Sequence, residues 1–201
     1  MRNWVVGAVN LGRLVINIRI ANPPEGLLAK YTRKEKDFFY SYAEFVLKSL
    51  TSGRVQEQLD ALIEKEHVSM TKAIDLRVMV FPARPLTGRP RNMLHGSYNQ
   101  DSAQISLYPL KIPWPRVRTE GNSLFKTPPA ELSRSQQRIL NQLYETAVST
   151  LIHEVLHVKF EGRNLPRYQE EAIVRKLESK YATEWFEKFE GDSAGTPLSL
   201  N

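Results

Sequence analysis

The stretch Leu151–Phe160 reads Leu-Ile-His-Glu-Val-Leu-His-Val-Lys-Phe. On an α-helix, His153 and His157 would lie on one face, one turn apart, and could direct two imidazole nitrogens at the same zinc ion. Glu154 would be rotated from His153 by roughly 100° about the helix axis. Its carboxylate would then lie beside a bound metal, where a general base takes a proton from a metal-activated water. The spacing therefore predicts a hydrolytic metal site on a helix.

The residues around this motif favour a helix that is buried on one side. The alternative is a surface helix that carries two histidines and a solvated glutamate by chance. Apolar residues fill the side of the helix opposite the histidines: they are Ala147, Val148, Leu151, Ile152, Val155 and Leu156. Because the polar residues interrupt an otherwise apolar helix, the sequence favours a metal site over a chance match.

The third metal ligand has to come from outside the motif, because a catalytic zinc takes three protein ligands and keeps one position open. The chain has no cysteine and only four histidines. The other two, His67 and His95, lie far from the motif in sequence. We therefore expect a carboxylate as the third ligand.

Two glutamates follow the motif at a suitable distance. Gly162 is a suitable C-cap for the motif helix, and Arg167–Phe189 is predicted to form a second helix. Glu170 and Glu171 lie in its first turn, where acidic residues are also favoured by the helix dipole alone. They follow His157 by about fourteen residues, so a helix-loop-helix return would bring either of them back to the metal.

The motif and the stretch Gln169-Glu170-Glu171-Ala172-Ile173 resemble the gluzincin metallopeptidases, as a compact member of the zincin group. In that family the motif helix is followed by a loop and a second helix, whose early glutamate completes the zinc site and often precedes a small residue. The resemblance implies Zn²⁺ bound by His153, His157 and Glu171, with Glu154 as the general base. Glu170 is the second choice for the third ligand.

The resemblance also raises two questions about supporting residues. Several gluzincins have an acidic residue one turn after the ligand glutamate, which orients a histidine, but this chain has Arg175 there. Another carboxylate or a backbone carbonyl would have to replace it. Such enzymes usually also need a donor for the oxyanion of the tetrahedral intermediate, and the candidates are His95, Tyr98 and Tyr168.

The order of predicted elements indicates an α+β fold with a small mixed sheet. The elements are a hairpin (Trp4–Val9 and Leu14–Ile20), helices over Arg33–Leu50 and Arg54–Glu66, a strand over Leu76–Phe81, an edge hairpin within Leu94–Leu107, an irregular segment over Pro109–Pro129, a motif helix from Ser133 to about Glu161, and the glutamate helix. We expect a single zincin-like domain over 1–190. Within it, 1–70 forms the N-terminal hairpin and backing helices, 75–190 forms the catalytic core, and 191–201 is a flexible tail.

The hairpin within Leu94–Leu107 resembles the edge hairpin that precedes the motif helix in many zincins. The outer strand of that hairpin pairs with an extended peptide substrate in the family. A free sheet edge offers backbone donors and acceptors for this kind of pairing. The resemblance therefore implies a peptide or protein substrate.

The composition fits an intracellular globular protein. The 201 residues are 41% hydrophobic, which is enough for a core, and the absence of cysteine excludes disulfides and thiolate metal ligands. Met1–Val6 shows no signal peptide, and no apolar run approaches the length of a membrane span. We expect a cytoplasmic protein that does not contact membranes.

Basic residues cluster in the middle of the chain, whose formal net charge is +6. Between Arg77 and Arg118 there are seven basic residues and a single acid, Asp101. A basic rim of this kind suits an acidic substrate or nucleic acid, although solubility is an equal explanation. The residues that would contact nucleic acid are Arg84, Arg89, Arg91, Arg116 and Arg118.

Three hypotheses about function follow. The first is a zinc metallopeptidase that hydrolyses peptide bonds through a metal-activated water. The second is a zincin-fold regulatory or binding protein without general catalysis, whose basic surface contacts nucleic acid or an acidic partner. The third is a peptidase that is selective for one partner. The intact Glu154 argues against the second hypothesis, because a purely structural zinc site has no use for a base.

Overall fold

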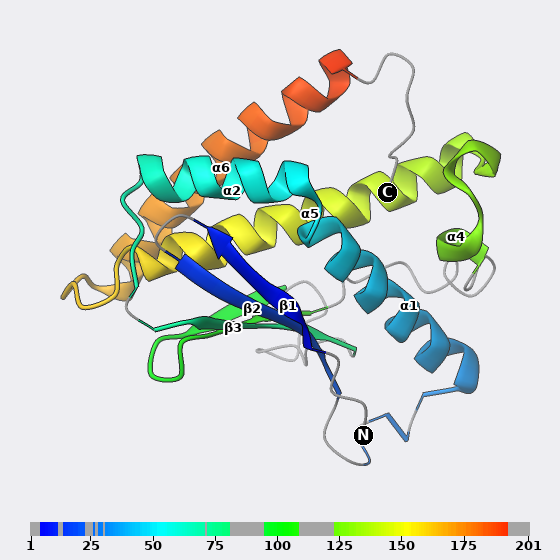
Figure 1. Ribbon diagram of the computed structural model, residues 1–201, viewed down its shortest axis with the longest axis horizontal. Helices are drawn as coiled ribbons and strands as arrows, with labels where there is room; N and C mark the ends of the chain where they lie inside the picture. The colour runs from blue at the N-terminus through cyan, green and yellow to red at the C-terminus, as the bar shows by residue number, and fades with distance from the viewer. Residues whose placement is uncertain are drawn as a thin grey trace.

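The computed structural model describes residues 5–11, 14–22, 26, 28–29, 31–70, 72–80, 95–108 and 123–192 (Figure 1). Several sequence predictions fall outside these residues. They concern the five arginines proposed to contact nucleic acid, most of the segment 109–129, and the chain from 193 to 201. They remain predictions from the sequence.

The strands form one five-stranded mixed sheet in the order β1-β2-β3-β5-β4. The hairpin of β1 (Val5–Leu11) and β2 (Leu14–Ala21) is antiparallel, and β3 (Ile74–Met79) pairs with β2 in parallel. Next, β5 (Gln104–Leu107) pairs with β3 in parallel, and β4 (Gly96–Asn99) pairs with β5 in antiparallel orientation. Because β4 pairs only with β5 in this sheet, it is an edge strand.

Four long helices and two short ones complete the described chain. They are α1 (Arg33–Leu50), α2 (Gly53–Lys65), α4 (Ser123–Lys126), a 3-10 helix (Pro129–Glu131), α5 (Arg134–Val158) and α6 (Arg167–Asp192). Because β2 and β3 are parallel, the chain between them has to cross over, and α1 and α2 form this crossover. No helix within these described ranges is both long enough and apolar enough to cross a membrane.

One face of the sheet is apolar and is covered by helices. Side chains on β2 and β3 alternate between buried and partly exposed, as expected for a strand with one covered face. In Figure 1, α2, α5 and α6 lie on the same side of the sheet. Contacts of α1 with β2 and β3, and of α5 with β4 and β5, close the core from that side. The helix α6 packs on α5.

The predicted fold class, α+β with a small mixed sheet, is confirmed at this level. Three details of the predicted elements were wrong, besides the end of the motif helix. The glutamate helix continues through Asp192, so the first two residues of the predicted tail are helical. The segment predicted as irregular contains α4 and the start of the 3-10 helix. The strand predicted over Leu76–Phe81 is formed by Ile74–Met79. Val80 is apolar and buried, but it follows Met79, the last paired residue.

The end of the motif helix also differs from the prediction. Regular α-helix ends at Val158, and Lys159 is its C-cap. The next residues continue as tight turns, with hydrogen bonds such as Phe160 N–H to the His157 carbonyl at 3.0 Å. Gly162 then adopts φ +74°, which L residues with a Cβ rarely adopt, and reverses the chain. This glycine therefore ends the turn that follows the helix and is not the cap itself.

Candidate metal centre

The helix that carries the motif, α5, has a defined start and a buried side. Ser133 is its N-cap and forms a capping box with Gln136, whose side chain accepts a hydrogen bond from the Ser133 N–H at 2.9 Å. Leu151, Ile152, Val155 and Leu156 are at most 1% exposed. Burial of this side fixes the rotation of the helix. It leaves the histidines on the side that faces α6.

The glutamate helix returns alongside α5 in the opposite direction. Among the residues of α6 whose burial is described, Val174, Tyr181 and Trp185 are buried, and they hold the helix against the core. A polar contact secures the same arrangement at the end of α5. The Glu66 carboxylate accepts hydrogen bonds from the Lys159 ammonium group at 2.6 Å and from the Tyr181 hydroxyl group. This contact joins α2, α5 and α6, so the position of α6 along α5 is determined.

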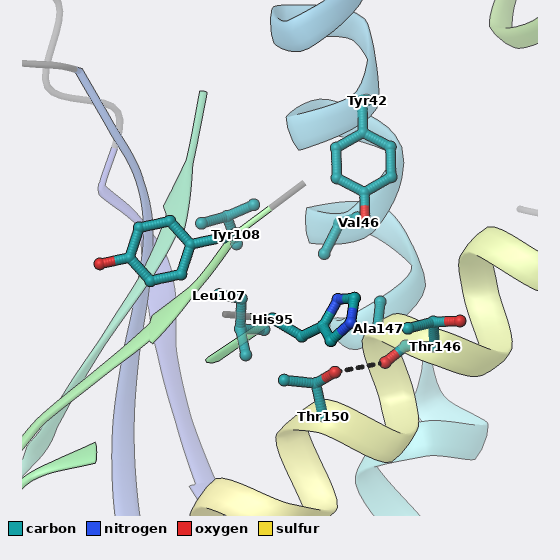
Figure 2. A pocket seen from close by; sticks show the side chains of 9 residues that line it. Tyr42, Val46, His95, Leu107, Tyr108, Thr146, Ala147 and Thr150 are labelled. Carbon is teal, nitrogen blue, oxygen red and sulfur yellow. Dashed lines mark hydrogen bonds between the residues drawn. The ribbon is translucent and has the colours of Figure 1, made fainter. Parts of the chain in front are cut away.

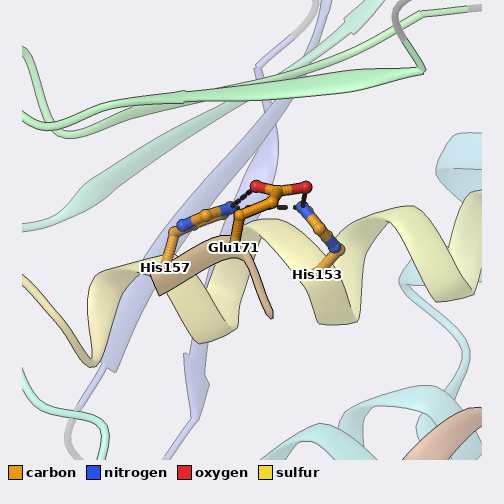
Figure 3. A group of neighbouring side chains, drawn as sticks. All are labelled: His153, His157 and Glu171. Carbon is orange, nitrogen blue, oxygen red and sulfur yellow. Dashed lines mark hydrogen bonds and ion pairs between the residues drawn. The ribbon is translucent and has the colours of Figure 1, made fainter. Parts of the chain in front are cut away.

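Three side chains from the two helices converge on one point. His153, His157 and Glu171 each offer one ligand atom, and these atoms lie within 4.8 Å of one another. The two Nε2 atoms are 3.1 Å apart, and the Glu171 oxygens lie 3.6 Å from His153 Nε2 and 3.4 Å from His157 Nε2. Figure 3 shows the carboxylate reaching between the two imidazole rings.

These separations fit a tetrahedral zinc ion. Nitrogen and oxygen ligands about 2.1 Å from such an ion are about 3.4 Å from one another. The Nε2 to Nε2 separation of 3.1 Å lies below this value. The separations of 3.6 Å from His153 Nε2 to Glu171 Oε1 and of 3.4 Å from His157 Nε2 to Glu171 Oε2 lie above or at it. The donor set of two imidazoles and one carboxylate is also one that catalytic zinc sites use. The residues present therefore fit the metal that the sequence predicts.

Two further glutamates hold the rings from their other side. His153 Nδ1 lies 2.8 Å from a Glu178 oxygen, and His157 Nδ1 lies 2.6 Å from a Glu170 oxygen. When each Nδ1 hydrogen is donated to its glutamate, a neutral ring has only a lone pair on Nε2. Two such lone pairs and the Glu171 carboxylate then face one another, and a cation between them relieves this repulsion.

These two glutamates can orient the histidines, although Arg175 stands where several gluzincins have an acidic residue for this purpose. The sequence predicted that another carboxylate or a backbone carbonyl would orient a histidine, and Glu178 and Glu170 occupy these positions. Glu170, the second choice for the third ligand, lies against Nδ1 of His157 and outside the converging set. The sequence analysis missed Glu178. Its spacing of seven residues from Glu171, two helical turns on the same face, was the available signal.

Glu154 is buried and its ionisation is shifted. Its side chain lies inside the protein at 5% exposure, and the backbone N–H of Tyr98 on β4 donates a hydrogen bond to it. Burial raises the pKa of the Glu154 carboxyl to about 7, opposed by the nearby His153 and reinforced by the charge of Glu171. A carboxyl with a pKa in this range can take up and release a proton near neutral pH, a condition suited to a general base.

The edge strand approaches Glu154 closely at Gly96. A Cβ atom at this position would lie 2.7 Å from Glu154 Oε1 and 2.5 Å from the Thr150 methyl group, closer than real Cβ atoms come. With the Thr150 and Glu154 side chains in these positions, only glycine allows β4 to pass this close to α5. Sequence analysis did not single out Gly96, because the requirement arises only once the two elements are placed together.

Arg175 contacts the candidate ligand itself. Its Nε donates a hydrogen bond of 2.8 Å to Glu171 Oε1, and its side chain is 72% exposed. Burial opposes ionisation of Glu171, but Arg175 and the two histidines together hold the pKa of its carboxyl below the usual value. The ligand is therefore ionised at neutral pH, as metal binding requires.

The two tyrosines among the candidate oxyanion donors form hydrogen bonds away from the histidine rings. The Tyr98 hydroxyl donates to Glu161 at 3.0 Å, and burial together with Glu161 raises its pKa. Tyr168 is 73% exposed, and its hydroxyl accepts a hydrogen bond from Gln169. The hydrogen bonds described here direct neither hydroxyl at the His153 and His157 rings.

His95 lies in a separate small pocket at the start of β4 (Figure 2). Residues of α1, α5 and the strand ends line it, namely Tyr42, Val46, Val78, Leu107, Tyr108, Thr146, Ala147 and Thr150. Figure 2 shows the His95 ring near Thr146 and Thr150, which precede the motif on α5. Burial against this lining lowers the pKa of the His95 imidazole. The ring is therefore neutral at physiological pH.

Comparisons with protein-family models, with curated proteins and with solved structures found no match to this chain. The function is therefore argued from the geometry of the site.

Proposed function

We propose that the protein is a zinc-dependent metallopeptidase of the gluzincin type. The observation that carries this proposal is the convergence of His153, His157 and Glu171 at separations that suit one tetrahedral ion. The paired glutamates on the outer ring nitrogens support it, because metal-bound histidines almost always donate their second N–H to such a group. Two solvated surface histidines would require neither a converging carboxylate nor glutamates at their outer ring nitrogens.

In this proposal the protein's own residues divide the work of hydrolysis. Zinc held by His153, His157 and Glu171 would supply Lewis acidity toward a water and toward the scissile carbonyl. Glu154 accepts the proton of the attacking water and delivers it to the leaving amine. The backbone N–H of Tyr98 and the close approach of Gly96 hold the Glu154 carboxylate in place. Glu170 and Glu178 fix the rotation of the imidazole rings.

The proposed substrate is an extended peptide that pairs with β4. Two features support this assignment: β4 is the edge of the sheet, and it passes directly over α5 beside Glu154. A strand added to this edge would bring a peptide carbonyl close to the base without any rearrangement of the sheet. The orientation of β4 relative to the motif is what favours a peptide over a small-molecule substrate.

A hydrolysis assay tests the proposal. The zinc-loaded protein is incubated with a mixture of synthetic peptides of varied sequence, and the products are identified by mass spectrometry. We expect cleavage of a subset of peptides that Glu154→Gln slows by about 10²–10⁴-fold, because it removes the general base and keeps the shape. Glu184→Gln, an exposed change on α6, is the matched control. Equal cleavage by the wild type and Glu154→Gln would show that the activity comes from a contaminant or another site.

A further inference from the structure

Arg175 is the cation that contacts the candidate ligand set, and most of its guanidinium remains available. Its Nε is bonded to Glu171, whereas the described residues supply no hydrogen bond or ion pair to its two Nη groups. The side chain is 72% exposed, so these groups are accessible to solvent beside Glu171. Two parallel N–H groups of this kind match the geometry of a carboxylate.

The directions of the surrounding elements place Arg175 toward one end of the proposed substrate. β4 runs in the same direction as α5, because Gly96 packs against Thr150 and Glu154 while Tyr98, two residues later, reaches Glu161. The helix α6 runs the opposite way, with Glu170 at His157 and Glu178 at His153. Arg175 therefore lies toward the His153 and Gly96 end of the site.

A peptide that pairs with β4 in antiparallel orientation would run from the Tyr98 end toward the Gly96 end. Antiparallel pairing is the commoner and slightly more stable arrangement. The part of the substrate that follows the cleaved bond would then lie on the side of Arg175. Its guanidinium is separated from His153 by the Glu171 carboxylate alone, with contacts of 2.8 and 3.6 Å. One or two extended residues, at about 3.3 Å each, cover this separation.

We propose that Arg175 binds a carboxylate of the substrate on the C-terminal side of the cleaved bond, which makes the site selective for peptides with an anion at this position. The anion is either the free C-terminus, which would define a carboxypeptidase, or the side chain of an aspartate or glutamate. This inference rests on the proposed function, because it needs a substrate carbonyl at the metal. It assigns a role to the residue that departs from the gluzincin pattern.

A simpler role for Arg175 gives a different expectation. An exposed pair of Glu171 and Arg175, four residues apart on one helix, is a common surface contact with a small effect on helix stability. If that is its whole role, removal of the guanidinium would not change the preference of the site between charged and neutral ligands. A comparison of matched ligands therefore separates the two roles.

The test uses the protein loaded with Co²⁺ in place of zinc, and ligands that bind without being cleaved. Mercaptoacetyl-leucine and mercaptoacetyl-leucinamide differ only in the terminal carboxylate. Mercaptoacetyl-glutamate and mercaptoacetyl-glutamine, both amidated at the C-terminus, differ only in the side-chain charge. The absorption of the cobalt–thiolate bond gives each dissociation constant. Within each pair, the affinity ratio does not depend on how much metal a variant holds.

In the wild type we expect one or both carboxylate ligands to bind about ten- to a hundredfold more tightly than their neutral partners, as hydrogen bonds between charged groups do. The pair that shows the preference identifies the source of the anion. The ratio should fall close to one in Arg175→Ala and lie between these values in Arg175→Lys, which keeps the charge but loses the two-pronged contact.

Lys176→Ala is the matched control, since it removes an exposed positive charge from the neighbouring position on α6. It should keep the wild-type ratio. A ratio near one for both pairs in the wild type, or an unchanged ratio in Arg175→Ala, would overturn the role of Arg175 while leaving the metal site intact. Failure of the protein to bind Co²⁺ at all would instead overturn the proposed function and this inference with it.

Discussion

The two sides of α5 are held in place by different physical means. On one side, Leu151, Ile152 and Leu156 are at most 1% exposed and pack into the core. On the other, the His153 and His157 side chains are 18% and 15% exposed and are oriented by glutamates from α6. The apolar side depends on area removed from water, whereas the polar side depends on individual contacts. Substitutions on the two sides should therefore affect different properties of the protein.

The largest effect on stability is expected from the apolar side. Leu156→Ala should lower the free energy of unfolding by about 2–5 kcal/mol, because it leaves a cavity where a fully buried side chain was. Chemical denaturation followed by circular dichroism measures this change. Gln142→Ala, on the exposed surface of the same helix, should change it by less than about 0.5 kcal/mol. Equal effects of the two substitutions would show that α5 is not anchored by its apolar side.

Glu154 combines the properties of the two sides of α5, because it is both buried and ionisable. Its pKa in the metal-free fold, about 7, lies above the ordinary value of 4.5. The unfolded chain therefore releases this proton first as the pH rises. The contribution of Glu154 to stability, roughly 3 kcal/mol, is complete below about pH 4.5. It falls progressively as the pH rises from there and is lost above pH 7.

Unfolding of the metal-free protein at pH 5 and pH 8 tests this expectation. The wild type should lose more stability over this interval than Glu154→Gln, which has no proton to release and shares all other titrating groups. Parallel pH profiles for the two proteins would show that Glu154 ionises as it does in the unfolded chain.

The smallest expected effect is the sharpest test of the polar side. Glu178→Gln should weaken zinc binding by about 10–100-fold, because the carboxylate that orients His153 and strengthens it as a donor becomes a neutral amide. Competition with a chromophoric chelator measures the affinity. The unfolding of the metal-free protein should change little. A large loss of stability with unchanged zinc affinity would assign Glu178 to the fold and not to the site.

The fold was predictable where one residue pattern decides one element. The β-branched residues of Leu14–Ile20 and the capping box at Ser133 and Gln136 identified β2 and the start of α5 from sequence alone. The strand order was not predictable in this way, because it depends on how the chain crosses between parallel strands. The end of α5 was misjudged because tight turns at Phe160 and its neighbours continue the helical course as far as Gly162.

The residues of the candidate site also fall into those that the sequence predicts and those that it does not. His153, Glu154 and His157 belong to one helical turn, so their spacing alone places them together. Glu171 needed the resemblance to a family. Glu178 and Gly96 are tied to the site by the packing of α6 and β4 on α5, and local sequence carries little signal for such packing. Contacts within one element are thus predictable from spacing, whereas contacts between elements require the fold.

Metal content is the measurement that tests the central claim most directly. The purified protein is incubated with zinc, freed of excess metal and examined by elemental analysis, beside Glu171→Ala and the exposed control Glu184→Ala. The account predicts about one zinc per chain in the wild type and in Glu184→Ala, and strongly reduced zinc in Glu171→Ala. A wild-type protein without zinc, or a Glu171→Ala variant that retains it fully, would contradict the assignment of this site.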